Sequence, residues 1–441
     1  MRTITLRATA VLFALAATGA SLVASTPKAA AATTVEAAAT ALQLSNYTVT
    51  DVSGTGDITK ALTAAVLPAG GPYAPRIVHL PVGPLTLDES IHPADNVYLV
   101  ADLGTTVTWR GTNGFMIRFA NTTGGVYGGT WNGAGRASTT LIGAINGKVR
   151  VADVTVTRAG QYGIVARTNS TLIIRDVTAT SNKIDGVHVE ASHLDAAGLR
   201  ATGNRRNGVQ LSGKSSGVIT GSVLNSNGQA VSGSTTGKIG HGLGVAASSV
   251  TVHSSSMSSN KVCGVSLSKS ARVDINDSQL DHNGRHGLGT VPGTTATISD
   301  STVNSNGYNG VLASGSKTHV TLKGVTIANS RASGISVPSG GTATVSDSTI
   351  TGSRKFNISV TRGSITFGGV GNQVNNSRRD GLLLSGSRSS GRIESLTSFT
   401  GNRGSGIVVA SKAKLRMVHC TFSGNKHQIQ KRSGGRVYYL D

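Results

Sequence analysis

Short runs of alternating apolar and polar residues fill most of this chain and return at a nearly constant interval. In residues 181–189 the run is a glycine followed by apolar, variable and apolar positions, and close relatives of it recur about every 22 to 25 residues. The repeat glycines are Gly163, Gly186, Gly208, Gly242, Gly264, Gly287, Gly310, Gly334, Gly381 and Gly406. This period predicts a solenoid, in which each repeat buries its apolar face against its neighbours.

A second alternating run precedes each glycine strand, as in 148–156, 271–280 and 318–327. Period-two alternation indicates strands with one inward face. Between the two runs an asparagine recurs, and stacked asparagines can form side-chain amide ladders while tolerating left-handed turn geometry. These asparagines are Asn182, Asn204, Asn227, Asn260, Asn283, Asn306, Asn402 and Asn425.

The N-terminal third departs from the repeat. Residues 1–32 have a basic start, an apolar core and an Ala-x-Ala end, which is typical of a signal peptide. We expect a mobile leader over 33–53, and a cap with the first coils over 54–147. Asp57 is a suitable N-cap for a helix over 57–66 that would cover the first coil. Residues 148–441 form the repeats, continuous with 54–147, and 229–238 would be a projecting loop.

Composition is consistent with many short strands, since glycine occurs 58 times and aromatic residues make up 4%. No segment beyond the signal peptide is apolar enough to span a membrane, so we expect a secreted, extracellular protein that is not inserted in a membrane. We expect a monomer. Cys263 and Cys420 fall many coils apart, which predicts two separate buried thiols rather than a disulfide.

The repeat resembles the right-handed parallel β-helix of the pectate-lyase-like superfamily, from about residue 77 to the C-terminus. Residues 54–62, 79–83 and 96–99 look like the capping helix and first coil of that superfamily. The resemblance implies an all-β fold, a single-stranded right-handed parallel β-helix of about 12 or more coils with an N-terminal capping helix. It does not by itself imply one activity, because this fold carries lyases, hydrolases, epimerases, tailspikes and adhesins.

Basic residues occupy a fixed place in the repeat. With 41 basic and 20 acidic residues the chain carries a net charge of +21. Stacked like charges repel each other, so an unpaired basic column favours an extended polyanion as partner, against the alternative that the charges merely solvate turns. Export and the lack of an aromatic stacking pattern favour an acidic polysaccharide, and we expect no nucleic acid. The candidate substrate-binding residues are Arg167, Lys183, Arg205, Arg206, Gln210, Lys261, Arg285, Arg331, Arg354 and Arg378.

Asp185 and His188 are unusual for their places in the repeat, and Glu190 follows on the same face. Stacking predicts Arg167 beside Glu190, Gln210 beside His188, and Asn207 beside Asp185. A histidine with carboxylate and arginine neighbours suits acid/base chemistry.

Residues 182–189 and 240–242 are similar to two polygalacturonase signatures, and the similarity implies roles for Asp185 and His241. Asn207 stands where that family has a pair of aspartates, which hydrolysis requires. The candidate catalytic residues are therefore Asp185, His188, Glu190, Asn207 and His241. We expect no cofactor and no metal, since His241, Cys263 and His286 would stack too far apart to share an ion.

The leading hypothesis is a secreted lyase that cleaves a uronate-containing polysaccharide by β-elimination. Arg205, Arg206 and Asn207 would neutralise the carboxylate, His188 or a basic residue of the column would be the base, and Tyr162 or His241 the acid. A C5-epimerase or a glycoside hydrolase on the same scaffold is an alternative. A non-catalytic polysaccharide-binding or adhesive protein is another.

Overall fold

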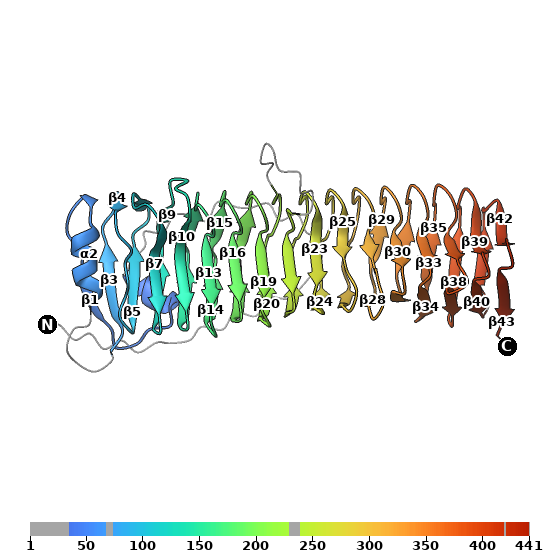
Figure 1. The fold of residues 1–441 in the computed structure, drawn as a ribbon, viewed down its shortest axis with the longest axis horizontal. Helices are drawn as coiled ribbons and strands as arrows, with labels where there is room; N and C mark the ends of the chain where they lie inside the picture. Colours follow the sequence, from blue (N-terminus) through green and yellow to red (C-terminus); the bar gives the residue numbers. More distant parts are fainter. Residues whose placement is uncertain (1–34, 68–73, 229–238, 419, 441) are drawn as a thin grey trace. The chain divides into compact units, whose positions relative to one another are not determined.

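The computed structural model describes residues 35–67, 74–228, 239–418 and 420–440. The predicted signal peptide and the predicted projecting loop lie outside these residues. Within them the chain forms a parallel β-helix of about 15 turns, in which every paired strand is parallel to its neighbour (Figure 1). Each coil has three faces, which we call A, B and C. The predicted all-β solenoid is confirmed.

Face A is a 17-stranded sheet in which each coil pairs with the next. Its strands are β1 (Thr48–Asp51), β3 (Arg76–Leu80), β5 (Val97–Ala101), β8 (Thr123–Tyr127), β11 (Lys148–Ala152), β14 (Thr171–Arg175), β17 (His193–Ala197), β20 (Ser216–Thr220), β22 (Ser249–His253), β24 (Arg272–Asn276), β26 (Thr295–Ser299), β28 (His319–Lys323), β31 (Thr342–Ser346), β34 (Ser364–Gly368), β37 (Ser390–Ile393), β40 (Lys414–Met417) and β43 (Arg436–Tyr439).

Face C contains the strands that follow the repeat glycines, in a 14-stranded sheet. Its strands are β7 (Gly114–Ala120), β10 (Thr139–Ile145), β13 (Ile164–Arg167), β16 (Val187–Glu190), β19 (Val209–Ser212), β21 (Leu243–Ala246), β23 (Cys263–Ser268), β25 (His286–Gly289), β27 (Val311–Leu312), β30 (Ile335–Pro338), β33 (Ile358–Thr361), β36 (Leu382–Ser385), β39 (Ser405–Ala410) and β42 (His427–Lys431).

Face B consists of a seven-stranded and a five-stranded sheet, joined between β18 and β29 by single parallel bridges such as Val223 to Ser256. The seven strands are β2 (Gly56–Asp57), β4 (Pro84–Leu87), β6 (Thr106–Trp109), β9 (Thr130–Asn132), β12 (Thr155–Thr157), β15 (Thr178–Thr180) and β18 (Arg200–Thr202). The five strands are β29 (Thr326–Ala328), β32 (Thr349–Thr351), β35 (Asn372–Asn375), β38 (Thr397–Thr400) and β41 (Cys420–Ser423).

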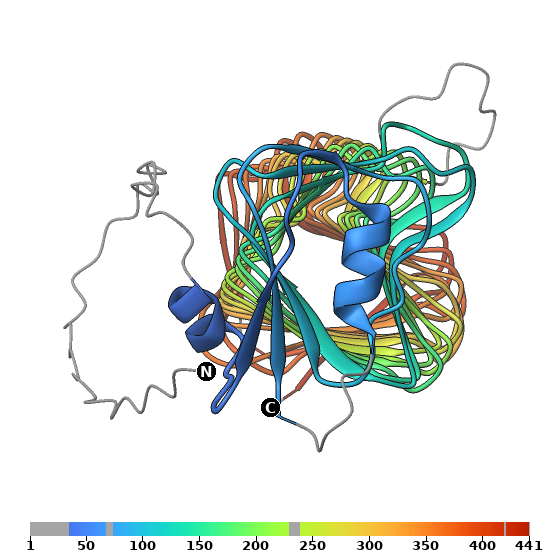
Figure 2. The same cartoon turned by 90° about the vertical axis from the view of Figure 1, so that its left-hand side faces the viewer.

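The interior is a continuous column of inward-facing valine, isoleucine and leucine side chains, widened near the N-terminal end by Trp109 and Trp131. Helix α2 (Thr59–Val66) lies across the N-terminal end of the coils, where Leu62 and Val66 join this core (Figure 2). The helix begins at Thr59 rather than at Asp57. The Asp57 carboxylate accepts hydrogen bonds from the backbone and hydroxyl of Thr59 at 2.9 and 2.6 Å.

Residues 35–51 differ from the mobile leader expected for 33–53. Helix α1 (Val35–Ala41) packs Ala38 and Ala39 against Tyr98 and Tyr127 on the outside of face A, and β1 starts that sheet. The leader prediction was wrong over these residues because the small alanine side chains of α1 pack against tyrosine rings of face A.

The asparagine ladder is confirmed. Asn182 donates its backbone and amide N–H groups to the side-chain oxygen of Asn204 at 3.1 and 3.0 Å, and the pattern continues to Asn227. The ladder asparagines are buried, except for the half-buried Asn425, and do not adopt left-handed backbone, contrary to expectation. The preceding residue does so instead, as at Ser181 with φ 58°. Cys263 and Cys420 are both free, Cys263 buried and Cys420 half-buried. No helix in the described ranges is long and apolar enough to cross a membrane.

Candidate functional site

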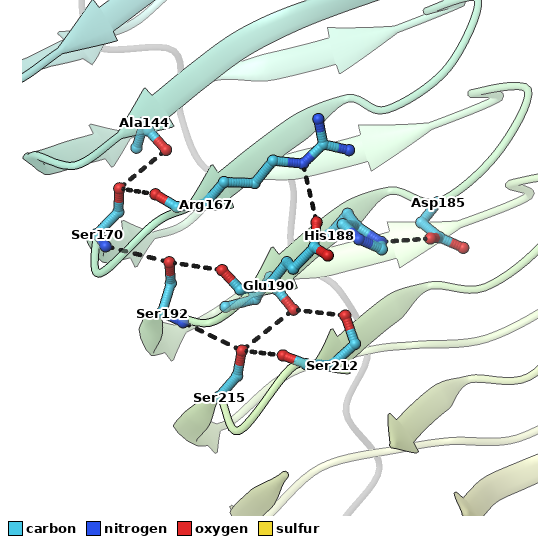
Figure 3. Close-up of polar contacts among 10 residues, drawn as sticks. Ala144, Arg167, Ser170, Asp185, His188, Glu190, Ser192, Ser212 and Ser215 are labelled. Carbon is cyan, nitrogen blue, oxygen red and sulfur yellow. Dashed lines mark hydrogen bonds and ion pairs between the residues drawn. The ribbon is translucent and has the colours of Figure 1, made fainter. Parts of the chain in front are cut away.

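Asp185 and His188 form a pair at the edge of face C. Asp185 lies in the turn before β16 and is 0% exposed, while His188 is 7% exposed. The Asp185 carboxylate is 3.0 Å from Nδ1 of His188 (Figure 3). A buried carboxylate at this distance favours the tautomer with hydrogen on Nδ1, which leaves the lone pair on Nε2. His188 therefore has the arrangement of an oriented base.

The same carboxylate holds two further groups. Arg206 Nε lies 3.2 Å from Asp185 Oδ1, and the backbone N–H of Asn207 donates to that oxygen at 3.1 Å. Burial of an unpaired carboxylate would be costly, and these contacts offset that cost. They also show that Asp185 cannot touch a ligand directly, because its oxygens are enclosed. This enclosure places Asp185 where it can orient His188, and its predicted catalytic role stays a prediction.

The predicted neighbours lie where stacking places them. β16 pairs with β13 and β19 in a register that sets Arg167 beside Glu190 and His188 beside Gln210. Arg167 Nε is 3.3 Å from Glu190 Oε2, and its guanidinium lies 5.6 Å from the centre of the Tyr162 ring. Glu190 is thus half-exposed and paired. It is separate from the Asp185–His188 pair, to which no contact joins it in the described chain.

Tyr162 covers His188. The two ring centres are 4.5 Å apart at an interplanar angle of 30°. This stacking explains why His188, on the outer side of β16, is nearly buried. A phenol and an imidazole are thus adjacent on the outer surface of face C.

A hollow of about 200 Å³ with a mostly polar lining lies on the coils that follow, where Gln210 of its wall is the strand neighbour of His188; neither His188 nor Tyr162 lines it. Its wall includes Arg206, Asn207, Gln210, His241 and Gly244. Asn207 donates its amide to Gln210 Oε1 at 2.9 Å and accepts the backbone N–H of His241 at 3.0 Å. Gly244 stands opposite Gln210, and a Cβ there would lie 2.3 Å from Gln210 Oε1. The hollow depends on this glycine.

His241, Cys263 and His286 stack in one column, as expected. The backbone N–H of Cys263 donates to His241 Nδ1 at 3.3 Å. Burial lowers the pKa of His286 to about 4 and raises the pKa of the Cys263 thiol to about 11, so both are neutral at pH 7. No cluster of three or more histidine, cysteine, aspartate or glutamate side chains that could hold a metal occurs in the described part of the chain.

The basic candidates fall into two groups. Lys183, Arg205 and Arg206 lie at the coils of the Asp185–His188 pair, where Lys183 Nζ donates to the carbonyl of Gly135. Lys261 and Arg285 are exposed further along. Arg331, Arg354 and Arg378 lie on coils far toward the C-terminus, so they cannot share one sugar with His188. Between Lys261 and Arg331, the corresponding positions of two coils are occupied by Gly284 and Gly307 instead of a basic residue.

Sequence reasoning missed a second hollow, of about 380 Å³, near the C-terminus. Its lining includes Asp380, Arg403, Lys426, His427 and Arg432. Asp380 occupies the same column as Asp185, the place before the repeat glycine, so continuing that column past Asn309 would have found it.

The chain is similar to several solved structures. The A-module of mannuronan C-5 epimerase AlgE4 from Azotobacter vinelandii is 16% identical, with a TM-score of 0.50 over 88% of this chain and 97% of that module. The surface adhesin PfbA of Streptococcus pneumoniae is 14% identical, with a TM-score of 0.31 over 87% and 93% of the two chains. Tailspike protein 3 of bacteriophage CBA120 is 11% identical, with a TM-score of 0.40 over 87% and 59%.

No curated protein matches the chain at a significant level. The family described as "Right handed beta helix region" matches residues 141–295, 200–327 and 286–440, which together cover more than half of the sequence. These matches begin at residue 141, before the coils that carry the asparagine ladder and the Asp185–His188 pair, and continue to residue 440. The chain therefore belongs to the right-handed β-helix family.

Proposed function

We propose that the outer surface of face C around His188 is the active site of a secreted, extracellular enzyme that acts on an acidic, uronate-containing polysaccharide. The observation that carries this proposal is the pairing of the buried Asp185 carboxylate with His188 at 3.0 Å beside a hollow lined by polar groups. A histidine oriented in this way is suited to act as a general base.

The favoured reaction is β-elimination. Nε2 of His188 takes the C5 proton, the electron pair forms the C4–C5 double bond, and the C4–O4 bond breaks. The leaving oxygen takes a proton from Tyr162 or His241. Arg206 and the amides of Asn207 and Gln210 would bind the uronate carboxylate, where negative charge develops before the bond breaks.

Hydrolysis by two carboxylates is less well supported. Asp185 is enclosed and already accepts contacts from His188, Arg206 and Asn207, while Glu190 is paired with Arg167. Neither is a free acid facing the hollow. Epimerisation, the activity named for the AlgE4 module, begins with the same removal of the C5 proton and ends with its return on the opposite face of the sugar.

Incubation of the purified protein with a panel of polyuronates tests the proposal, with ultraviolet detection of unsaturated chain ends. We expect His188→Ala to lower kcat by about 100-fold or more, the usual contribution of a general base. His193→Ala, an exposed histidine on the same coil, is the matched control and should have no effect. Asp185→Asn should lower kcat and alter its pH profile with little change in KM.

The same panel in deuterated water separates the alternatives. Deuterium at C5 without chain shortening would indicate an epimerase. A protein that yields neither product from any polyuronate is not an enzyme of this class. If it still binds the polymer, and His188→Ala binds equally well, then the function is that of a binding or adhesive protein.

A further inference from the structure

Four arginines stack on consecutive coils near the C-terminal end of the β-helix. Arg331, Arg354, Arg378 and Arg403 are all exposed. The backbone N–H of Arg354 donates to Ser330 at 2.9 Å, and those of Arg378 and Arg403 donate to Ser353 and Ser377 at 3.0 and 2.9 Å. Because each coil rises by about 4.8 Å, the guanidinium groups form a row of closely spaced positive charges.

Two hollows open along this row and share Arg378. The first, of about 470 Å³, is lined by Arg331, Arg354 and Arg378 with no acidic residue in its wall. The second, of about 380 Å³, adds Arg403, Lys426 and other basic groups around a single acid, Asp380. The two hollows together are a continuous cationic surface, which we call the C-terminal basic platform; its basic residues are Arg331, Arg354, Arg378, Arg379, Arg403, Lys426 and Arg432.

The platform carries far more basic than acidic charge, since Asp380 is the one acidic residue in the linings of its two hollows. Within the described ranges none of its basic residues is in an ion pair, whereas Arg167 and Arg206 near the Asp185–His188 pair are paired with acids. Two charges 4 Å apart repel by about 1 kcal/mol even in water, so a row of them is unfavourable in the free protein. An anionic ligand that lies along the row would remove this repulsion.

Asp380 repeats part of the geometry of the first site within the platform. It occupies the column of Asp185, and its carboxylate accepts the backbone N–H of Ser405 at 2.7 Å, as that of Asp185 accepts the N–H of Asn207. Three residues later, where the first site has His188, stands Leu383. The platform therefore repeats the turn geometry of the first site without a histidine in the place of His188, and its own histidine, His427, is exposed on β42 instead.

We propose that the C-terminal basic platform is a second binding site for the same acidic polysaccharide, which holds a distant part of the chain while another part occupies the hollow beside His188. The column runs from Asp185 through Asn207, His241, Cys263, His286, Asn309, Ser333 and Phe356 to Asp380, which is eight coil steps. At about 4.8 Å per step the two sites lie about 38 Å apart. Only a long polymer can reach both, and binding at two linked sites raises overall affinity.

The chemistry favours a polysaccharide over nucleic acid. Recognition of single-stranded nucleic acid relies on aromatic side chains that stack on bases, and neither hollow is lined by phenylalanine, tyrosine or tryptophan. Arginine forks suit carboxylate groups, which an acidic polysaccharide presents at regular intervals. This inference rests on the proposed function for one point, namely that the ligand is an acidic polysaccharide.

The test is a comparison of two triple variants that remove equal charge. Arg354→Gln, Arg378→Gln and Arg403→Gln together neutralise the platform. Lys414→Gln, Arg416→Gln and Arg436→Gln together neutralise exposed residues of face A near the same end of the coils. With a long polyuronate, the platform variant should show a KM or Kd about tenfold higher, since three exposed charge contacts contribute about 0.5 kcal/mol each. The control variant should match the parent protein.

Two further measurements test the proposal: kinetics with short and long substrates, and direct binding of the polymer. The platform variant should keep the parent kcat, and its KM for oligomers too short to span 38 Å should be unchanged. Equal effects of the two triple variants, or equal losses with short and long chains, would overturn the proposal. Direct binding of labelled polyuronate to both triple variants tests the platform even if the protein has no lyase activity. Tighter binding of single-stranded DNA than of polyuronate at the platform would overturn the ligand class.

Discussion

The repeat glycine and the ladder asparagine constrain each other. A Cβ at Gly186 would lie 2.8 Å from the amide nitrogen of Asn204, and one at Gly264 would lie 2.9 Å from that of Asn283. Real Cβ atoms do not approach so closely without displacement, so a coil followed by a ladder asparagine needs glycine. The glycine in the sequence signature therefore exists to make room for the next coil, although it does not have a left-handed backbone here.

One coil reverses this arrangement. Asn357 occupies the glycine position, and the neighbouring ladder positions hold Ser353 and Ser377 in place of asparagine. The Asn357 side chain accepts the backbone N–H of Ser353 at 3.2 Å and lies 3.4 Å from the side-chain oxygen of Asn402. These are the contacts that an asparagine at position 377 would make. An amide in the repeat-glycine column therefore replaces one in the ladder column.

This exchange predicts a compensating pair of substitutions. Asn357→Gly should lower the free energy of unfolding by about 1–3 kcal/mol, because it leaves the buried N–H of Ser353 without a partner. Adding Ser377→Asn should restore most of the loss by rebuilding the standard ladder. Denaturant unfolding of both variants measures this, and a double variant less stable than Asn357→Gly alone would contradict it.

At the scale of elements, His79 ties together the first strands of face A. It lies in β3, with Nδ1 2.8 Å from Asp51 of β1 and Nε2 3.1 Å from Asp102, which follows β5. Burial alone lowers the pKa of His79, but the hydrogen bonds and charges of Asp102 and Asp51 outweigh burial and raise it above 6.5. The protonated ring thus joins three successive coils beside the site where α1 packs.

The raised pKa predicts how stability varies with pH. A group whose pKa is higher in the folded state stabilises fully below its unfolded pKa of about 6.5, and this contribution disappears as pH rises through the folded value. His79→Gln should therefore lower the unfolding temperature at pH of about 5.5 and have progressively less effect in alkaline buffer. Thermal unfolding across this range is the measurement, and a difference that does not vary with pH would show that protonation of His79 is unimportant.

At the scale of the whole molecule, charge dominates the expected behaviour. With a net charge of +21 on 441 residues, long-range attraction should speed the encounter with an anionic polymer. The on-rate for immobilised polyuronate should fall steeply between about 0.05 and 0.5 M salt, where the screening length becomes shorter than the spacing of exposed charges. A neutral polysaccharide is the control, and a similar salt dependence for both polymers would argue against electrostatic attraction.

The sequence by itself determined the solenoid, the ladder and the neighbours of Asp185, His188 and Glu190. The physical reason is that a repeat fixes its own register: residues one period apart must stack once each coil pairs with the next. It also predicted the separation of the two cysteines. The same logic would have reached Asp380 had the column been followed to the end of the chain.

Tertiary structure decided what depends on distance and burial rather than on period. Only the folded chain shows that Asp185 is fully enclosed and that Tyr162 covers His188. The packing of α1 on Tyr98 and Tyr127 could not be predicted either, because α1 lies outside the repeats. Side-chain direction and exposure vary between coils whose backbones are the same, because each side chain responds to the particular residues stacked on either side of it.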